Sequence, residues 1–297
     1  MISFNYEKAE ENYKKTIEIE PNYAPAYIAL AQIYWVSALI FFTPPNEYFP
    51  KYMALCNKAI DIDPDFAEAH SALGISKATY EYDWSGAEKS LVRAIDLNPG
   101  IPIVHFNYSV YLAPIGRMGE AIAEVKRCRE LDPYNWEYAH PHGFMLSFAR
   151  KFDQAMDQAQ KTLELAPDDP FRMWPLAMAY AGKGMYDKGI SLLQPYGNIP
   201  FNAAYLGYLY GKAGKAEEAQ KILDDFLGRA KQGYFSAQMI AQVYAGLGDR
   251  DMVFEWLNKA YEARDATQIF LKVHPPFADL YSDPRWTEQM EKRGLAD

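Results

Sequence analysis

Cysteine is scarce in this 297-residue chain, and positive charge is in deficit. The two cysteines, Cys56 and Cys128, lie far apart and in no metal-binding or redox spacing, which fits a reducing compartment. Lysine and arginine number 30 against 39 aspartate and glutamate residues, so the formal net charge is −9 at pH 7. Such a surface repels a phosphate backbone and gains nothing from an anionic membrane. We therefore expect a cytoplasmic protein that binds neither nucleic acid nor membrane.

The signatures of several other protein classes are missing. The N-terminus has no apolar core after a basic start, which excludes a secretory signal. There is no G-x-S-x-G motif, no phosphate-binding glycine loop and no cysteine paired with a histidine. Carboxylates are abundant, but most lie in or just before the first turns of expected helices, where the helix dipole favours them. The sequence predicts no enzyme, no cofactor and no metal site.

One apolar run has two possible interpretations. Residues 26–42 are almost continuously apolar, yet the run is shorter than the roughly 20 residues that a membrane span needs. It contains Gln32, has no basic flank and ends at Pro44 and Pro45. We interpret it as a buried helix of a repeat array, with an interfacial or membrane segment as the alternative.

A repeat of about 34 residues organises the chain. Helical stretches end again and again in a short acidic or apolar motif followed by proline. The successive prolines lie 43, 35, 34 and 34 residues apart, at Pro21, Pro64, Pro99, Pro133 and Pro167. A period of this length is typical of the two-helix tetratricopeptide (TPR) repeat.

Small residues recur in register with this period, at positions where helices must approach closely. In the first helices they are Ala31, Gly74, Ser109, Gly143, Ala177, Gly207 and Ala241, and in the second helices Ala9, Ala87, Ala121, Ala155, Gly189 and Ala219. Glycines at 116, 184, 214 and 248 predict left-handed turns between helices.

The pattern predicts an all-α fold, a TPR right-handed superhelical solenoid of antiparallel helix pairs. Residues 1–265 would hold a half repeat plus about seven pairs, and residues 266–297 a C-terminal cap, because the end of a solenoid otherwise exposes apolar surface. We expect Phe277, Leu280 and Trp286 of the cap to cover Phe254, Leu257 and Tyr261 of the last pair.

Four segments carry a more specific resemblance, residues 80–99, 116–133, 182–190 and 271–295. They resemble the TPR domain that forms the C-terminal half of large bacterial regulators, after a winged-helix DNA-binding, Ser/Thr kinase or nucleotide cyclase domain. The "YDW" at 82–84 and the "DPRW…GL" at 283–295 are the most specific parts. The resemblance implies a protein-interaction module. Because the chain starts in mid-repeat without an effector domain, we expect a fragment or a homologue that lost its effector.

First helices line the concave face of a TPR superhelix, and here they carry an aromatic and methionine-rich strip with few charges. The predicted partner-binding residues are Phe106, Val110, His140, Phe144, Trp174, Met178, Tyr208, Gln238 and Gln242. An exposed apolar strip often marks a partner site; the alternative is that these side chains are ordinary core. The Lys, Arg and Asn clamp that some TPR domains use for a C-terminal carboxylate is not found.

His70, His105 and His140 lie 35 residues apart, so we interpret them as repeat positions that pack or line the groove rather than as metal ligands. The function predicted from these features is a non-catalytic interaction or scaffold module. It would bind a peptide or partner domain in its concave groove, as the regulatory half of a bacterial signalling or transcription regulator. The alternative is a small-ligand sensor that controls an attached effector.

Overall fold

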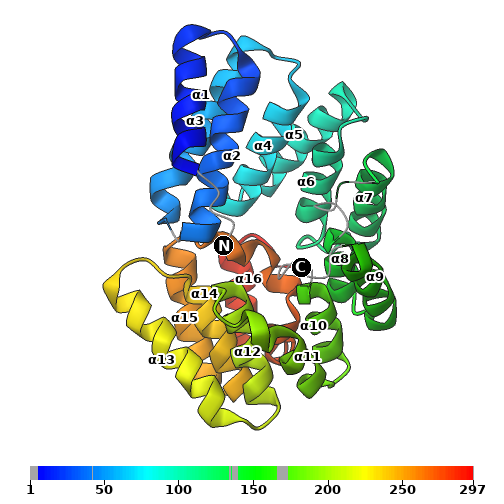
Figure 1. Ribbon diagram of the computed structural model, residues 1–297, viewed down its shortest axis with the longest axis vertical. Helices are drawn as coiled ribbons and strands as arrows, with labels where there is room; N and C mark the ends of the chain where they lie inside the picture. Colours follow the sequence, from blue (N-terminus) through cyan, green and yellow to red (C-terminus); the bar gives the residue numbers. More distant parts are fainter. Residues whose placement is uncertain (1–5, 42, 134, 136–139, 166–172, 297) are drawn as a thin grey trace.

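The computed structural model describes residues 6–41, 43–133, 135, 140–165 and 173–296, and these residues form helices and no strand (Figure 1). Helix α1 (Tyr6–Ile19) precedes a series of helix pairs. The pairs are α2 (Ala24–Phe41) with α3 (Pro45–Ile62), α4 (Ala67–Ser76) with α5 (Trp84–Leu97), α6 (Pro102–Leu112) with α7 (Met118–Leu131), α8 (His140–Phe148) with α9 (Phe152–Leu165), α10 (Met173–Gly182) with α11 (Tyr186–Leu193), α12 (Pro200–Lys212) with α13 (Ala216–Gln232), and α14 (Ala237–Leu247) with α15 (Arg250–Glu262).

Shorter elements complete the described chain. A π-helical turn, η1 (Lys77–Glu81), extends α4, and a 3-10 turn, η3 (Gln194–Tyr196), follows α11. After α15 come the 3-10 helices η4 (Ala266–Val273) and η5 (Pro275–Leu280) and the last helix, α16 (Pro284–Lys292). Residues 266–295 are called the C-terminal segment below.

The small residues lie where helices touch, as the sequence predicts. A Cβ atom added to Gly207 of α12 would lie 2.7 Å from Val243 Cγ2 of α14, and one added to Gly74 of α4 would lie 2.7 Å from Leu91 Cγ of α5. Neither position has space for a methyl group without displacement of its neighbour. Glycine is therefore required for close packing both between successive first helices and within a pair.

Left-handed turns join the two helices of several pairs. Gly116, Gly184, Gly214 and Gly248 have φ angles of 86°, 72°, 76° and 83°. Arg150 occupies the corresponding turn between α8 and α9 with φ at 57°, a conformation that side-chain-bearing residues adopt less easily. The repeat is thus regular in its turns even where the glycine is replaced.

The apolar run at 26–42 forms most of α2. Its residues Tyr27, Ile28, Leu30 and Ala31 are buried, and the ring of Trp35 packs edge-on against Phe49 of α3 with centroids 5.6 Å apart. Among the described residues, no helix combines the length and the apolar character needed to cross a membrane. The described side chains of the run, residues 26–36, thus pack largely within the repeat array.

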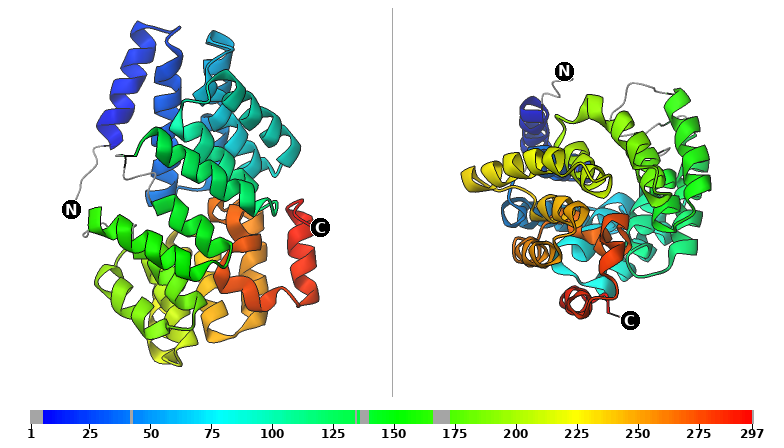
Figure 2. Two further views of the ribbon diagram at one scale, coloured as in Figure 1. Left: turned by 90° about the vertical axis from the view of Figure 1, so that its right-hand side faces the viewer. Right: turned by 90° about the horizontal axis from the view of Figure 1, so that it is seen from below.

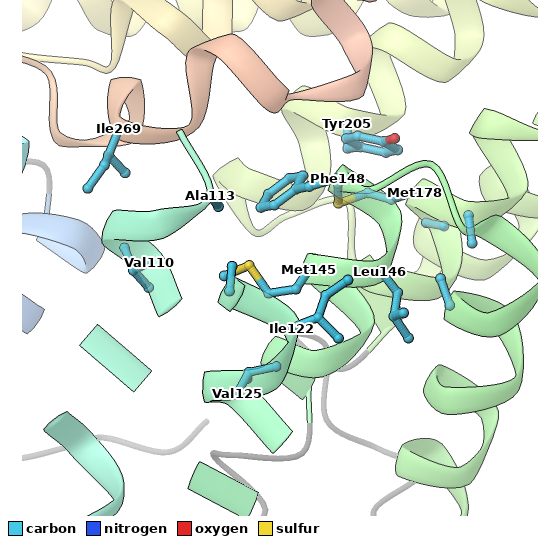
Figure 3. Packing of buried hydrophobic residues seen from close by; sticks show 14 of the residues in the cluster. Val110, Ala113, Ile122, Val125, Met145, Leu146, Phe148, Met178, Tyr205 and Ile269 are labelled. Carbon is cyan, nitrogen blue, oxygen red and sulfur yellow. The ribbon is translucent and has the colours of Figure 1, made fainter. Parts of the chain in front are cut away.

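The C-terminal segment turns back into the superhelix. Figure 1 shows its orange-to-red chain near the centre of the molecule, between the N-terminal helices and α12–α15. Ile269 joins the largest buried cluster, which also contains Val110, Ala113 and Phe148 from the first helices (Figure 3). Farther along, Phe277 and Trp286 lie in one buried cluster with Phe254 and Leu257 of the last pair. Figure 2 shows α16 on the outer side of these helices.

A set of five residues, Tyr82, Trp84, Tyr261, Arg264 and Arg293, is called the closing contact and ties the end of the chain to the second full pair. The indole Nε1 of Trp84 donates to the carbonyl oxygen of Arg293 at 2.6 Å. The Tyr82 ring stacks on Tyr261 with centroids 5.7 Å apart, and the Arg264 guanidinium lies 4.7 Å from the centre of the Tyr82 ring. Tyr261, expected beneath the cap, therefore faces Tyr82. The "YDW" and "DPRW…GL" motifs meet at this contact and close the superhelix.

Arg293 is buried completely, which is unusual for a charged side chain. Its guanidinium donates to the Gln268 side chain, to the Gln289 carbonyl at 2.7 Å and to the Leu257 carbonyl at 3.1 Å. Burial lowers the pKa of Arg293 to about 10, so the group remains charged at neutral pH. A buried charge persists only where hydrogen bonds replace its hydration, and here these bonds join η4, α15 and α16.

Candidate interaction surface

The predicted groove residues all come from first helices, but they fall into two groups. Phe106, Phe144 and Trp174 are half-buried at the surface, whereas the others that can be placed are buried: Val110, Met178, Tyr208, Gln238 and Gln242. His140 begins α8, and its side chain lies outside the described residues.

The C-terminal segment engages one member of the buried group directly, Gln238. Gln238 donates from Nε2 to the Thr267 carbonyl at 3.0 Å, and its backbone N–H donates to the Asp265 carboxylate at 3.2 Å. Both of these donors are thus engaged by the chain itself, whereas the buried Oε1 of Gln238 has no hydrogen-bond partner among the described residues. The structure corrects this part of the predicted groove, because Val110, Met178, Tyr208, Gln238 and Gln242 form closed wall rather than open surface.

Asp265 fixes the point at which the C-terminal segment enters the interior. Its buried carboxylate accepts hydrogen bonds from Ser236 Oγ at 2.7 Å, Thr267 Oγ1 at 2.8 Å and the backbone N–H groups of Thr267 and Gln238 at 3.1 and 3.2 Å. Such a carboxylate is stabilised because each lone pair facing the interior has a donor. The bonds join α14 to the start of η4.

His274, in the C-terminal segment, packs against aromatic rings of two first helices. Its ring centroid lies 6.3 Å from that of Phe148 in α8 and 6.5 Å from that of Tyr205 in α12. Burial lowers the pKa of His274 to about 3, so the imidazole is neutral at physiological pH. This histidine packs as an uncharged ring between first helices.

The exposed part of the wall is an aromatic strip, defined here as Phe106, Phe144, Trp174 and Phe201. Trp174 meets Phe144 edge-on with centroids 5.2 Å apart and meets Phe201 with centroids 5.9 Å apart. All four rings are half-buried and lie in the N-terminal halves of α6, α8, α10 and α12. Phe201 is not among the predicted groove residues, because it lies six residues before the small residue of its helix, Gly207, rather than three before or one after it, the spacing of the other rings. The sealed positions Val110 and Met178 lie one turn further along their helices.

The rings at the predicted positions Phe106, Phe144, Trp174 and Tyr208, called the ring ladder here, form a continuous series only in part. Tyr208 is reached from Trp174 through Tyr205, at centroid separations of 6.3 Å and 5.7 Å, and both tyrosines are buried. Burial raises the pKa of both phenols, so they stay neutral. The series of rings is thus half-buried as far as Trp174 and buried at Tyr205 and Tyr208 of α12.

The histidines at repeat positions have a shared structural role. The Nε2 atom of His70 lies 2.8 Å from the Pro64 carbonyl oxygen, and that of His105 lies 2.9 Å from the Pro99 carbonyl oxygen. Each imidazole thus forms a hydrogen bond with a backbone carbonyl of the turn that precedes its own helix. His105 also bonds Glu124 through Nδ1 at 2.6 Å, and this hydrogen bond raises its pKa. Within the described parts of the chain, no group of three or more potential ligands is placed to hold a metal ion.

The two cysteines are free and buried, in α3 and α7. Burial raises the pKa of both thiols to about 12. Because the thiolate is the nucleophile, neither side chain is suited to nucleophilic chemistry in this setting.

Comparison with known proteins supports a TPR repeat protein. No protein-family model matches the chain. It is 22% identical over 260 residues to the TPR repeat-containing protein YpiA of Bacillus subtilis, covering 85% of this chain and 59% of that protein. It is 28% identical over 132 residues to human tetratricopeptide repeat protein 13, covering 43% of this chain and 15% of that protein. The chain spans 15% to 59% of the length of the curated relatives it matches.

Solved structures show the fold. The Cut9–Hcn1 hetero-tetramer of the APC/C superposes with a TM-score of 0.62 at 16% identity, covering 90% of this chain and 52% of that chain. A tetratricopeptide repeat protein from Parabacteroides merdae superposes with a TM-score of 0.55 at 12% identity, covering 89% and 99% of the two chains. The fold is accordingly the TPR solenoid that the 34-residue period predicts.

Proposed function

We propose that this chain is a non-catalytic interaction module that binds a protein or peptide partner on the aromatic strip. The observation that carries the proposal is the contact of Phe144, Trp174 and Phe201, which brings three half-buried rings together from three successive first helices. Aromatic side chains at a surface are where interfaces concentrate binding energy. Relatives with interaction-related names, such as Hsp70-Hsp90 organizing protein 2 of Arabidopsis thaliana, agree with this role.

The chemistry of the strip indicates the kind of partner. Its four residues carry no charge, and the indole Nε1 of Trp174 is buried, so the strip offers ring faces and edges rather than a polar group. An apolar or aromatic side chain of a partner would pack against these rings. The closed part of the wall holds the rings in place and takes no part in binding.

The wider setting belongs to the same proposal. Residues 1–265 form the solenoid and residues 266–297 its cap, and together they act in the cytoplasm as the regulatory half of a bacterial signalling or transcription regulator. The resemblance of the "YDW" and "DPRW…GL" motifs supports that setting. The net charge of −9 supports a protein partner over nucleic acid or an anionic membrane.

Site-specific photo-crosslinking tests the proposal. A photoreactive phenylalanine analogue is placed at position 144 in the strip or, as a control, at position 92 in α5, where Val92 is exposed. We expect the same partner band from position 144 in repeated experiments, no such band from position 92, and its loss on Trp174→Ala. A band that appears equally from both positions, or one that survives Trp174→Ala in a folded protein, would refute the strip as the binding surface.

A further inference from the structure

A hollow lies between α7 and α9, the second helices of two successive pairs. It is a pocket of about 480 Å³ lined by residues of α7, α8 and α9 and of the turn before α9. Figure 1 labels these three helices. Pockets of roughly 300–1,000 Å³ are typical of small-molecule sites. Its lining residues are Ile122, Lys126, His142, Leu146, Lys151, Asp153, Gln154, Asp157 and Gln158.

The pocket carries uncompensated positive charge. Asp153 forms an ion pair with Lys183, and Asp157 forms one with Lys161 at 2.7 Å, so both carboxylates are neutralised by lysines outside the lining. The two lining lysines, Lys126 and Lys151, are exposed and form no ion pair with any described residue. The protein as a whole has a net charge of −9, so the charge of this pocket is opposite in sign to that of the protein.

His142 supplies a polar group in the pocket wall. Both of its ring nitrogens are buried and lack a hydrogen-bond partner among the described residues. Burial, together with the charges of Lys126 and Arg129, lowers the pKa of His142 to about 4, so the ring is neutral and offers one N–H donor. Buried ring nitrogens ordinarily have partners, and a ligand with an acceptor oxygen would supply one.

The rest of the lining suits a ligand with an apolar body. Ile122 of α7 and Leu146 of α8 line the pocket and belong to the large buried cluster shown in Figure 3. The Gln154 carboxamide adds a donor and an acceptor from α9. The pocket therefore combines an apolar floor, a neutral imidazole and two free ammonium groups at its rim.

We propose that this pocket binds a small anionic molecule. Its phosphate or carboxylate oxygens form ion pairs with Lys126 and Lys151 and accept a hydrogen bond from the N–H group of His142. The site is formed by residues of α7, α8, α9 and the turn before α9 and contains none of the four rings of the aromatic strip, so it does not depend on the proposed partner surface. Bound there, the anion would bridge α7 and α9, which belong to successive repeats. A ligand that contacts both helices stabilises the conformation in which α7 and α9 have the separation that fits it, relative to conformations with another separation.

The test uses the full chain and two probes, inorganic phosphate and citrate, which distinguish phosphate from carboxylate recognition. The ring signals of the histidines are followed by NMR at matched ionic strength, and His142→Gln identifies the His142 signal. We expect a saturable shift of this signal with at least one probe and a higher His142 pKa in its presence. Lys126→Gln and Lys151→Gln should each weaken binding about tenfold, as expected for loss of a hydrogen bond to a charged group.

Lys221→Gln, at an exposed position of α13, is the matched control and should leave the affinity unchanged. Melting curves establish that each variant is folded. The proposal is overturned if neither probe moves the His142 signal, or if Lys221→Gln weakens binding as much as Lys151→Gln, because the anions then act only as general counterions. Photo-crosslinking at position 144 reports on the aromatic strip separately, so either proposal can fail alone.

Discussion

Gly294→Ala tests the closing contact most sharply. Gly294 has φ at 65°, and a Cβ atom there would lie 3.2 Å from Cδ1 and 3.3 Å from Nε1 of the Trp84 indole. The left-handed conformation costs an alanine about 1 kcal/mol. Displacement of the indole also weakens its 2.6 Å hydrogen bond to the Arg293 carbonyl oxygen, which contributes about 1 kcal/mol. The free energy of unfolding should therefore fall by about 2 kcal/mol, a large share of the total of about 5–15 kcal/mol for a typical protein.

Urea denaturation of the full chain measures this change. Gly228→Ala in α13 is the matched control, because a Cβ atom at Gly228 meets no heavy atom within 4 Å and the residue lies inside a helix. The control should raise stability by about 0.5–1 kcal/mol, since glycine is unfavourable in a helix. Trp84→Phe, which keeps a ring and removes the N–H donor, should cost about 1 kcal/mol. If Gly294→Ala is as stable as the unmodified chain while Gly228→Ala is stabilised as expected, the closing contact does not exist in solution.

Three further changes probe other parts of the fold. Ala121→Trp overfills a fully buried position of α7 and should destabilise the protein by about 1–3 kcal/mol; an unchanged melting temperature would show that Ala121 is misplaced. Deletion of residues 271–297 removes Phe277 and Trp286 from their buried cluster and should cause aggregation in light scattering, whereas a stable monomer would contradict the packing. His105 has a raised pKa because it bonds Glu124, so its stabilising contribution is complete below the unfolded pKa near 6.5 and is lost as the pH rises through the higher folded value. The stability difference between the unmodified chain and His105→Gln should be full below about pH 6 and shrink as the pH rises through the folded pKa, and a constant difference would count against the His105–Glu124 bond.

The sequence predicts the repeat architecture well because each TPR pair contacts mainly its neighbours. The glycine turns at 116, 184, 214 and 248 have the left-handed backbone expected of them. The close approaches at Gly74 and Gly207 lie at the positions that the period indicates. These features depend on local spacing, which can be read along the chain.

The path of the C-terminal segment could not be read in this way. Trp84 and Arg293 are 209 residues apart, and no periodic pattern states that two such positions meet. The same holds for the contact of Phe270 with Phe148, whose ring centroids are 4.9 Å apart. The predicted groove residues lie on first helices, but no local pattern states that five of them are buried or that Gln238 bonds Thr267 of the C-terminal segment.

Hydrogen exchange of the full chain, followed by mass spectrometry, tests most directly whether the C-terminal segment is a fixed part of the wall. Buried anchors at Asp265, Leu271, Phe277 and Arg293 predict that peptides from residues 266–295 exchange as slowly as those from α12 and α14. Fast exchange of residues 266–295 with α12 and α14 still protected would contradict this arrangement. In that case the concave groove would be open over its whole length.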